Sequence, residues 1–542
     1  MKINLSKKTV FVLFVGTVFV FFSFKSNFFE VAKQIEIYNT LFKELNMYYI
    51  DEINPAELTN KAIKNTLKDL DPYTVFYDAQ DIEDARIRKE GEYGGIGVSV
   101  YYLKKGIQIN EIYKGYSADR AGLKAGDIIV SIDEQPLKNM ERDQLSLFLK
   151  GTPNSTFSIE ILRQGELLKK EISRDKITVK AVPFAEMVDA ETGYIALTRF
   201  NNNASFEVKK AFQKLKNQGM QRLVFDLRSN PGGSLLQSVN IANFFLPKGN
   251  VIVKTKAKVK KWSTTYRASN EPLDLEIPIV VLINGRSASA SEIVSGALQD
   301  YDRAVIMGER SFGKGLVQSY RKLTYGTQLK VTISKYYTPS GRCIQELDYA
   351  NRDSEGVVPK FSEQGIQEFK TSNGRIVFDG GGILPDVKIK TSNITEATNT
   401  LLKSKAIFNY ATHYYHQNSQ IASVTNFDLK EGDFKKFTNY LKSDTTFRTK
   451  QESLFSDANN SITTQNISTE FKGIQEKLLV DKIVEISKNK DILKKHLKEE
   501  IIKRYYYQEG VYLHYLKNDS VIKEAMLLLQ NQDTYKRLLF AN

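Results

Sequence analysis

Residues 277–308 read IPIVVLINGRSASASEIVSGALQDYDRAVIMG, and this stretch decides the fold. A continuous apolar run leads through a loop of small residues into a helical pattern, and a second apolar run closes it. Apolar runs without polar alternation are typical of strands buried on both faces, and a helical segment between two of them predicts a parallel pair. Similar runs occur upstream, GYIALTRF at 193–200 and RLVFDL at 222–227. We therefore expect residues 177–395 to form an α/β core with a mostly parallel sheet.

Three further regions flank this core. Residues 27–88 carry apolar side chains at three- and four-residue spacing, which predicts helices. Residues 89–176 contain short β-rich runs separated by glycine and aspartate turns, which predicts a small β-rich domain. Residues 396–542 are polar, lysine-rich and helical in pattern. The predicted fold class is therefore a multidomain α/β protein with an inserted β-rich domain and helical N- and C-terminal regions.

The N-terminus has the pattern of a membrane segment. Lys2, Lys7 and Lys8 precede the uncharged, mostly apolar run 9–24, which as a helix would be roughly 24 Å long. This is slightly short for a bilayer crossing, and no clear cleavage site follows, so we favour an uncleaved anchor over a cleaved signal peptide. We expect residues 1–26 to form a cytoplasmic stub and inner-membrane anchor, because lysines ahead of an apolar run stay in the cytoplasm. The rest of the chain is then expected in the cell envelope, on the periplasmic side.

The charge balance and the rarity of cysteine and histidine limit the classes of function. The net charge is +14, but no zinc-ligand pattern, helix-turn-helix signature or compact arginine cluster accompanies it. This argues against nucleic-acid binding and favours an anionic membrane or cell-wall polymer as the counterpart of a basic surface. A single cysteine, Cys343, excludes an intramolecular disulfide and a thiolate metal cage, and we interpret it as a buried loop residue. All four histidines lie within 413–514, so we expect no metal site and no cofactor.

The residues that could take part in catalysis lie in three loops after predicted strands: DLRSNPGGSL (226–235), NGRSASASEI (284–293) and GERSFGKGLVQ (308–318). A serine hydroxyl needs an activating base to attack a carbonyl, and residues 27–412 contain no histidine. Lys314, flanked by two glycines, is the remaining base, because burial lowers the pKa of a lysine and leaves a neutral amine. Paired glycines ahead of a helix present backbone N–H groups that suit an oxyanion. Together these loops indicate acyl transfer.

The stretch GRSASASEIVSGALQDYDRAVIMGERSFGKGLVQ (285–318) closely resembles the signature of the carboxyl-terminal processing peptidases, or tail-specific proteases. The match includes LDPYTVF, DLRSNPGG, YYTPSGRCIQ and GGILPDV, and covers roughly residues 60–390. This resemblance implies a peptidase core with layers like those of crotonases and Clp proteases. It implies Ser289 as nucleophile, Lys314 as base and Gln318 as the residue that orients the base. It leaves Ser287 and Ser291 as small neighbours of the nucleophile.

The resemblance also assigns the oxyanion donors and the β-rich domain. The donors are the backbone N–H of Ala290 and that of Gly232 or Gly233, between which the sequence does not choose. Residues 89–176 resemble a PDZ domain, and YGGIGV resembles a loop whose backbone N–H groups hold a terminal carboxylate. The residues expected in that loop are Gly95, Ile96, Gly97 and Val98. The expected partners are proteins or peptides with free C-termini.

Two rival functions remain open at this point. The chain could be a catalytically inactive PDZ scaffold, which the joint presence of Ser289, Lys314 and Gln318 disfavours. It could instead be a Ser-His hydrolase, which the positions of the histidines disfavour. The sequence does not identify the natural substrate, a homo-oligomer or an adaptor protein, or the role of residues 396–542.

Overall fold

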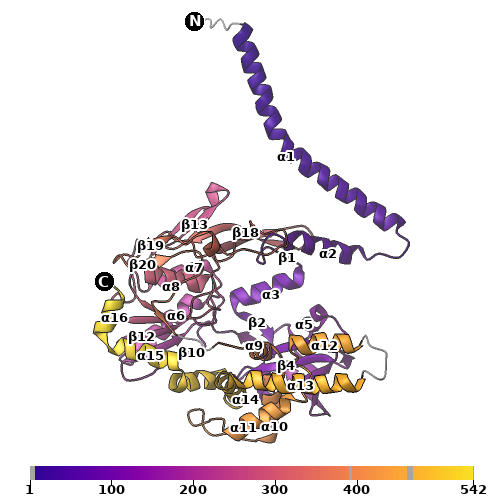
Figure 1. Ribbon diagram of the computed structural model, residues 1–542, viewed down its shortest axis with the longest axis vertical. Coiled ribbons are helices and arrows are strands. Elements are labelled where there is room, and N and C mark those ends of the chain that lie inside the picture. Colours follow the sequence, from indigo (N-terminus) through magenta and orange to yellow (C-terminus); the bar gives the residue numbers. More distant parts are fainter. Residues whose placement is uncertain (1–6, 390–392, 461–467, 541–542) are drawn as a thin grey trace. The chain divides into compact units, whose positions relative to one another are not determined.

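The computed structural model describes residues 7–389, 393–460 and 468–540 (Figure 1). The chain divides into two compact units, and the boundary in the sequence lies between Phe76 and Tyr77. The break lies inside the range 27–88, which the sequence grouped as one helical region. The first unit contains α1 (Lys7–Tyr48) and α2 (Pro55–Lys68), and β1 (Val75–Tyr77) crosses the break. In the described part of the chain, no helix combines the length and apolar character of a membrane span. The side chains of the predicted anchor, residues 9–24, lie outside the described residues, so the anchor has no support here.

The β-rich region opens the second unit after α3 (Ala79–Glu90). Its main sheet is antiparallel in the order β3-β4-β5-β7-β8, with β6 beside β5, and β2 pairs with β9. Ile107, Ile129 and Ile161 form the centre of a separate apolar core. The elements are β2 (Glu92–Gly95), β3 (Val98–Leu103), β4 (Gly106–Ile112), α4 (Ser117–Arg120), β5 (Ile128–Ile132), β6 (Gln135–Pro136), α5 (Arg142–Leu149), β7 (Thr156–Arg163), β8 (Glu166–Ser173) and β9 (Asp175–Thr178).

A six-stranded sheet in the order β10-β11-β12-β15-β16-β21 forms the centre of the second unit. Only β10 is antiparallel, so the predicted mostly parallel α/β sheet is confirmed. Parallel strands need cover on both faces, which is why their sequences are continuously apolar. The strands are β10 (Phe184–Met187), β11 (Thr192–Ala196), β12 (Arg222–Asp226), β15 (Ile279–Ile283), β16 (Val305–Gly308) and β21 (Val387–Lys388).

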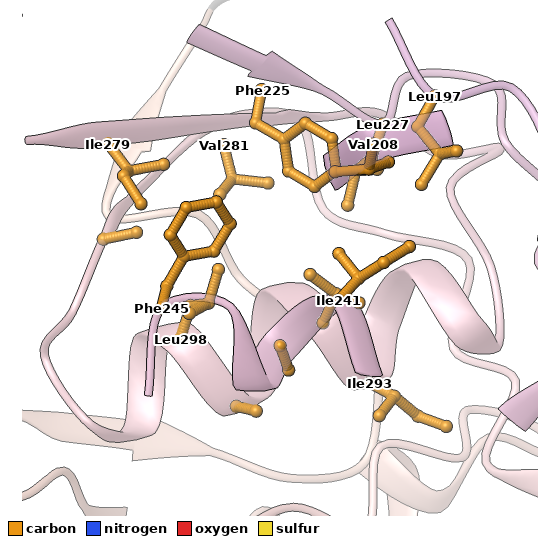
Figure 2. Close-up of a cluster of buried hydrophobic side chains, with 14 of the residues drawn as sticks. Leu197, Val208, Phe225, Leu227, Ile241, Phe245, Ile279, Val281, Ile293 and Leu298 are labelled. Atoms are coloured by element: carbon orange, nitrogen blue, oxygen red, sulfur yellow. The ribbon is translucent and has the colours of Figure 1, made fainter. Parts of the chain in front are cut away.

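One face of this sheet packs against α6 (Ala204–Asn217), α7 (Leu235–Asn243) and α8 (Ala290–Asp300). Figure 2 shows Phe225 and Val281 on the strands facing Ile241 and Leu298 on the helices. All four side chains are fully buried. This core holds α8, the helix that begins directly after Ser289, against the sheet.

The other face is covered by the end of the chain. Val224, Val280 and Leu282 pack with Ile522 and residues near it from α15 (Ser520–Gln530) and α16 (Gln532–Leu538). The hydroxyl of Tyr535 on α16 accepts a bond from Ile279 N (2.9 Å) and donates one to Ile279 O (3.1 Å). The last two helices are therefore a layer of the central α/β fold and do not belong only to a separate helical domain.

A second, antiparallel sheet runs in the order β14-β13-β18, with β17 beside β18. Its strands are β13 (Val251–Ala257), β14 (Thr264–Arg267), β17 (Leu316–Lys322) and β18 (Gln328–Tyr337), and η1 (Lys260–Trp262) lies between β13 and β14. A short hairpin follows, with the 3-10 turn η2 (Phe361–Gln364), β19 (Glu368–Lys370) and β20 (Ile376–Phe378). This sheet lies next to the start of α8, because the Tyr336 hydroxyl donates to the carbonyl oxygen of Ser289 (3.1 Å).

The remaining helices form a third apolar core around Leu401, Phe437, Phe447 and Leu497. They are α9 (Glu396–Lys403), α10 (Ala406–Gln417), α11 (Glu431–Leu441), α12 (Lys450–Asn460), α13 (Ser468–Ser487) and α14 (Lys490–Asn518). The predicted helical C-terminal region is confirmed. α14 continues from this core to the central sheet, with a kink at Tyr507, whose φ is 57°.

Candidate active site

Three loops meet at one edge of the central sheet, where β12, β15 and β16 end side by side. They are the loops quoted from the sequence, and backbone hydrogen bonds join them. Ala288 N donates to Asn230 O (3.0 Å), and Phe312 N donates to Ser287 O (3.0 Å). The carboxyl edge of a parallel sheet is where such folds place their ligands. The structure thus brings the loops of Gly232, Ser289 and Lys314 together.

Ser289 occupies a strained backbone position at the start of α8. Its φ of 57° and ψ of −110° lie outside the regions that residues with side chains usually adopt. Such strain persists only where the surrounding structure enforces it, and it is concentrated at functional sites. Ser289 is half-buried, whereas Ser287 and Ser291 are fully buried. Of the three serines in the loop, Ser289 is the one with access to solvent.

The two neighbouring serines are structural hydrogen-bond donors and not merely small residues. Ser287 Oγ donates to the carbonyl oxygen of Leu227 (2.8 Å), and Ser291 Oγ donates to that of Asn230 (3.0 Å). Both acceptors lie in the loop that follows β12. These bonds fasten the loop of Ser289 to the loop of the paired glycines.

Glu292 joins the serine loop to the lysine loop, and sequence reasoning did not single it out. Its carboxylate accepts bonds from Ser289 N (2.6 Å) and Lys314 N (3.0 Å). It also accepts from Ser311 Oγ (2.6 Å) and Gly313 N (2.7 Å). The side chain has no solvent exposure, and burial raises the pKa of Glu292 to about 7, although these four donors oppose the rise. A glutamate in the first turn of a helix after a small-residue loop is the only local signal that could have identified it.

The lysine loop is held from its other side by the segment 342–345, part of the motif YYTPSGRCIQ that was quoted without a role. Gln345 Oε1 accepts from Gly315 N (2.8 Å), and a Cβ on Gly315 would lie 2.9 Å from Gln345 N. Arg342 is fully buried and paired with Asp300 at the end of α8 (2.7 Å). Lys314 therefore sits between two glycines whose backbones are pinned. Cys343, in the same segment, is partly buried, and this burial raises the pKa of its thiol.

The loop after β12 distinguishes its two glycines. Gly232 lies against the serine loop, since a Cβ there would be 2.9 Å from both Ser289 Cβ and Ala290 N. Its N–H, however, already donates to Asn230 Oδ1 (2.9 Å). The N–H of Gly233 has no hydrogen-bond acceptor among the described residues, and neither has that of Ala290 at the first position of α8. The N–H groups of Gly233 and Ala290 are thus not used within the described structure, and their role as oxyanion donors stays a prediction.

Arg228 connects the glycine loop to the C-terminal helices. Its guanidinium pairs with Asp226 at the end of β12 (2.6 Å) and with Asp519 at the start of α15 (3.1 Å). Burial by itself lowers the pKa of Arg228, but the two carboxylates raise it well above its usual range. Asp226 also accepts from the Tyr194 hydroxyl (2.8 Å). The turn that carries Asn230 and the glycines therefore begins at a buried ionic cluster.

Gln318 lies on β17, on the strand that continues from the lysine loop. Its amide nitrogen donates to Thr332 Oγ1 on β18 (3.2 Å). This bond fixes the side chain on the sheet, four residues beyond Lys314. All four histidines lie on α10 and α14, outside these loops. Among the described residues, no group of three or more metal-ligating side chains is arranged around a common point.

The β-rich region contains a groove beside the predicted carboxylate loop. Gly95, Ile96 and Val98 line it together with Leu149 and Arg199. Gly97 adopts a φ of +81°, and a Cβ there would lie 2.3 Å from Tyr116 Cβ, so the turn requires glycine. Arg199 follows the central strand β11, and its Nε atom is buried without a hydrogen-bond partner among the described residues. The groove combines apolar walls with a cation.

Comparison with known proteins identifies three regions. Residues 191–362 match the model of peptidase family S41, residues 84–162 match the PDZ domain, and residues 397–529 match the "Probable PDZ-protease, C-terminal helical domain". The Carboxy-terminal-processing protease of Bartonella bacilliformis is 35% identical over 58% of this chain and 73% of its own length. The "Probable CtpA-like serine protease" of Staphylococcus aureus is 34% identical over 56% of this chain, an alignment that spans 61% of that relative. The solved structure of a photosystem II D1 C-terminal processing protease is 26% identical, with a TM-score of 0.36, and covers 64% of this chain and 91% of its own.

Proposed function

The chain belongs to the family of carboxy-terminal-processing serine proteases with a PDZ domain, and from that premise we propose that it is an endopeptidase with a Ser289–Lys314 dyad. Its substrates are extracytoplasmic proteins or peptides with free C-termini. The observation that carries the proposal is the meeting of three loops around the strained Ser289, with Glu292 bonded to both Ser289 N and Lys314 N. An inactive scaffold would need no such arrangement.

The proposed reaction is acyl transfer to Ser289. Lys314, as the neutral amine, takes the proton of Ser289 Oγ while this oxygen attacks the scissile carbonyl. The negative charge that develops on the carbonyl oxygen is stabilised by the N–H groups of Gly233 and Ala290. Lys314 returns the proton to the leaving amine, and water then hydrolyses the acyl-enzyme by the reverse sequence of proton transfers. Gln318 acts by positioning the base.

The dyad is tested with the purified chain and a peptide substrate. Ser289→Ala and Lys314→Arg should each lower kcat by at least about a thousandfold, because arginine stays protonated and cannot act as a base. Gln318→Ala should lower kcat only about tenfold, since Gln318 exchanges no proton in the proposed reaction. A fluorophosphonate probe should label Ser289, as located by mass spectrometry. Labelling of another serine, or full activity in either dyad variant, would disprove the assignment.

The PDZ domain is proposed to recognise the terminal carboxylate through the loop Gly95–Val98, with Arg199 as the cation of the groove. An amidated tail loses a charge-assisted interaction on the order of 1.5–3 kcal/mol, or roughly a 10- to 150-fold loss of affinity. At subsaturating concentration, a peptide with a free apolar C-terminus should therefore be cut faster than its amide. Arg199→Gln should narrow this difference. Equal rates for acid and amide in the unmodified chain would refute tail selection and leave the dyad untouched.

A further inference from the structure

Two segments of the second sheet carry a large part of the charge of the molecule. Residues 251–267 contain six lysines and arginines, and residues 316–337 contain four, while neither segment has an aspartate or glutamate. The two segments together therefore carry ten positive charges, and the net charge of the whole chain is +14. The segments form β13, η1, β14, β17 and β18, so the charge is gathered on one sheet. We call this surface the basic sheet.

The cations of the basic sheet are not neutralised within the molecule. None of the ten forms an ion pair with a described residue. Lys256 and Lys335 stand directly opposite each other on β13 and β18, and both side chains are exposed. Like charges in this cross-strand position destabilise a sheet. Lys254 is also exposed and, by strand alternation, lies on the same face as Lys256, and Lys258, just after β13, is exposed too. Each of the two opposed lysines lies over an aromatic ring, Lys256 over Tyr337 (4.4 Å) and Lys335 over Phe361 (4.7 Å), but neither has a carboxylate partner among the described residues. Cations without a paired anion indicate an external anionic partner.

Amphipathic side chains accompany these cations. Trp262 in η1 is 38% exposed, and the Arg321 guanidinium lies over its ring at 4.8 Å, which joins the β13–β14 connection to β17. At the turn between β17 and β18, Leu323 is 46% and Tyr325 fully exposed. Tryptophan and tyrosine rings favour the headgroup level of a bilayer, where one part of the ring is apolar and the other wet. A purely aqueous polyanion offers no such environment for Leu323.

We propose that the basic sheet docks on the surface of an anionic lipid bilayer. Lysines and arginines near such a surface are each attracted by its negative potential, and the exposed rings add insertion at the headgroup level. The docked sheet contains Gln318 and Tyr336, and the Tyr336 hydroxyl contacts Ser289 O, so docking holds the catalytic loops close to the membrane. This attachment depends on folded residues of the second unit and is independent of the N-terminal segment.

Trp262 supplies a direct test because it is the only tryptophan in the chain. The purified full chain is mixed with vesicles of phosphatidylcholine alone or with added phosphatidylglycerol, and tryptophan emission is recorded. Anionic vesicles should shift the emission to the blue, and a spin label at headgroup depth should quench it. High salt should reverse both effects, because ions screen the attraction. Insertion of residues 9–24 alone leaves Trp262 in water, so the emission separates the two modes of attachment.

The variant Lys256→Gln/Lys335→Gln should bind anionic vesicles about 30-fold more weakly, because two cations near the surface are lost. Lys209→Gln/Lys210→Gln is the matched control, since these two exposed lysines lie on α6, outside the basic sheet. It should bind almost as the unmodified chain does, and thermal unfolding checks that both variants are folded. The proposal is overturned if Trp262 emission does not change on anionic vesicles, or if both variants lose binding equally. It is also overturned if a soluble polyanion such as polyphosphate shifts the emission and vesicles do not.

Discussion

Glu292 shows how much of the site depends on one buried side chain. It contacts the backbone N–H of both proposed dyad residues, across 22 positions of sequence in the case of Lys314. A second carboxylate, that of Glu309, links the same two loops by one longer bond, from Gly285 N (3.4 Å). An ionised carboxylate without solvent exposure is costly unless it is hydrogen-bonded, and four donors reduce that cost. The pKa of about 7 means that the cost is only partly removed.

This raised pKa predicts how stability depends on pH. Between the ordinary glutamate pKa of 4.5 and about 7, the folded chain holds a proton on Glu292 that the unfolded chain has released. The free energy of unfolding should therefore fall as pH rises through this window, by roughly 3 kcal/mol at most, and then level off. Glu292→Gln should remove this component, as measured by denaturant unfolding at about pH 5 and about pH 8. Glu271→Gln, at a position whose side chain is 78% exposed, should keep this pH-dependent component.

The same substitution should also lower activity. Glutamine presents one amide nitrogen where the carboxylate has an acceptor oxygen, so two of the four backbone and hydroxyl donors lose their partner. We expect kcat to fall at least about tenfold, because the loops of Ser289 and Lys314 lose their common anchor. Unchanged kcat in a folded Glu292→Gln variant would show that the two loops hold their geometry without it.

At the scale of elements, β12 and β15 need apolar cover on both faces of the sheet. Helices α6, α7 and α8 cover one face, and α15 helps to cover the other. Leu529 on α15 is fully buried in this layer, while Leu527 on the same helix is 65% exposed. Leu529→Ala should lower the free energy of unfolding by about 2–5 kcal/mol, because it leaves a cavity beside the sheet. Leu527→Ala should change it by less than about 0.5 kcal/mol. Chemical denaturation measures both, and equal effects would mean that α15 is not packed as described.

At the scale of the whole second unit, α14 and α15 contact both the PDZ domain and the glycine loop. Tyr507, at the kink of α14, donates to Asp119 (2.6 Å), and Glu509 pairs with Lys114 (3.2 Å). One helix further, Asp519 pairs with Arg228. Helices α14 and α15, which belong to the region to which the sequence assigned no chemistry, thus connect the PDZ domain to the loop of the proposed oxyanion donors.

Asp519→Asn tests whether this contact matters for the reaction. Asparagine keeps the cap of α15, where the side chain accepts from Val521 N and Ile522 N, but it removes the charge opposite Arg228. We expect kcat to fall by roughly five- to tenfold with little change in KM, since the altered loop is the one proposed to hold the reacting carbonyl, whereas the tail is proposed to bind in the PDZ domain. Lys495→Ala, which removes the other cation near Asp519, is the control and should leave kcat unchanged. A similar loss in both variants would point to general destabilisation.

The sequence by itself determined the parts whose patterns are local. Continuous apolar runs such as 279–283 predicted parallel strands, because a strand buried on both faces cannot alternate polar and apolar residues. Small residues around Ser289 and glycines around Lys314 indicated tight loops, and the family resemblance, now confirmed, assigned their roles. The roles of Ser289, Lys314 and Gln318 themselves stay predictions.

Only the tertiary structure decided which surfaces meet. The bond that Gly232 N donates to Asn230 Oδ1, which leaves Gly233 as the proposed oxyanion donor, depends on the path of one loop in space. The same holds for three other contacts: the bonds of Glu292, the packing of α15 on the sheet, and the pairing of Lys256 with Lys335. The residues that they join are from 3 to about 300 positions apart in the sequence. Periodicity reports the conformation of a segment and the face it buries, because these follow from backbone geometry. The identity of the buried partner follows from packing among distant segments, which no local pattern encodes.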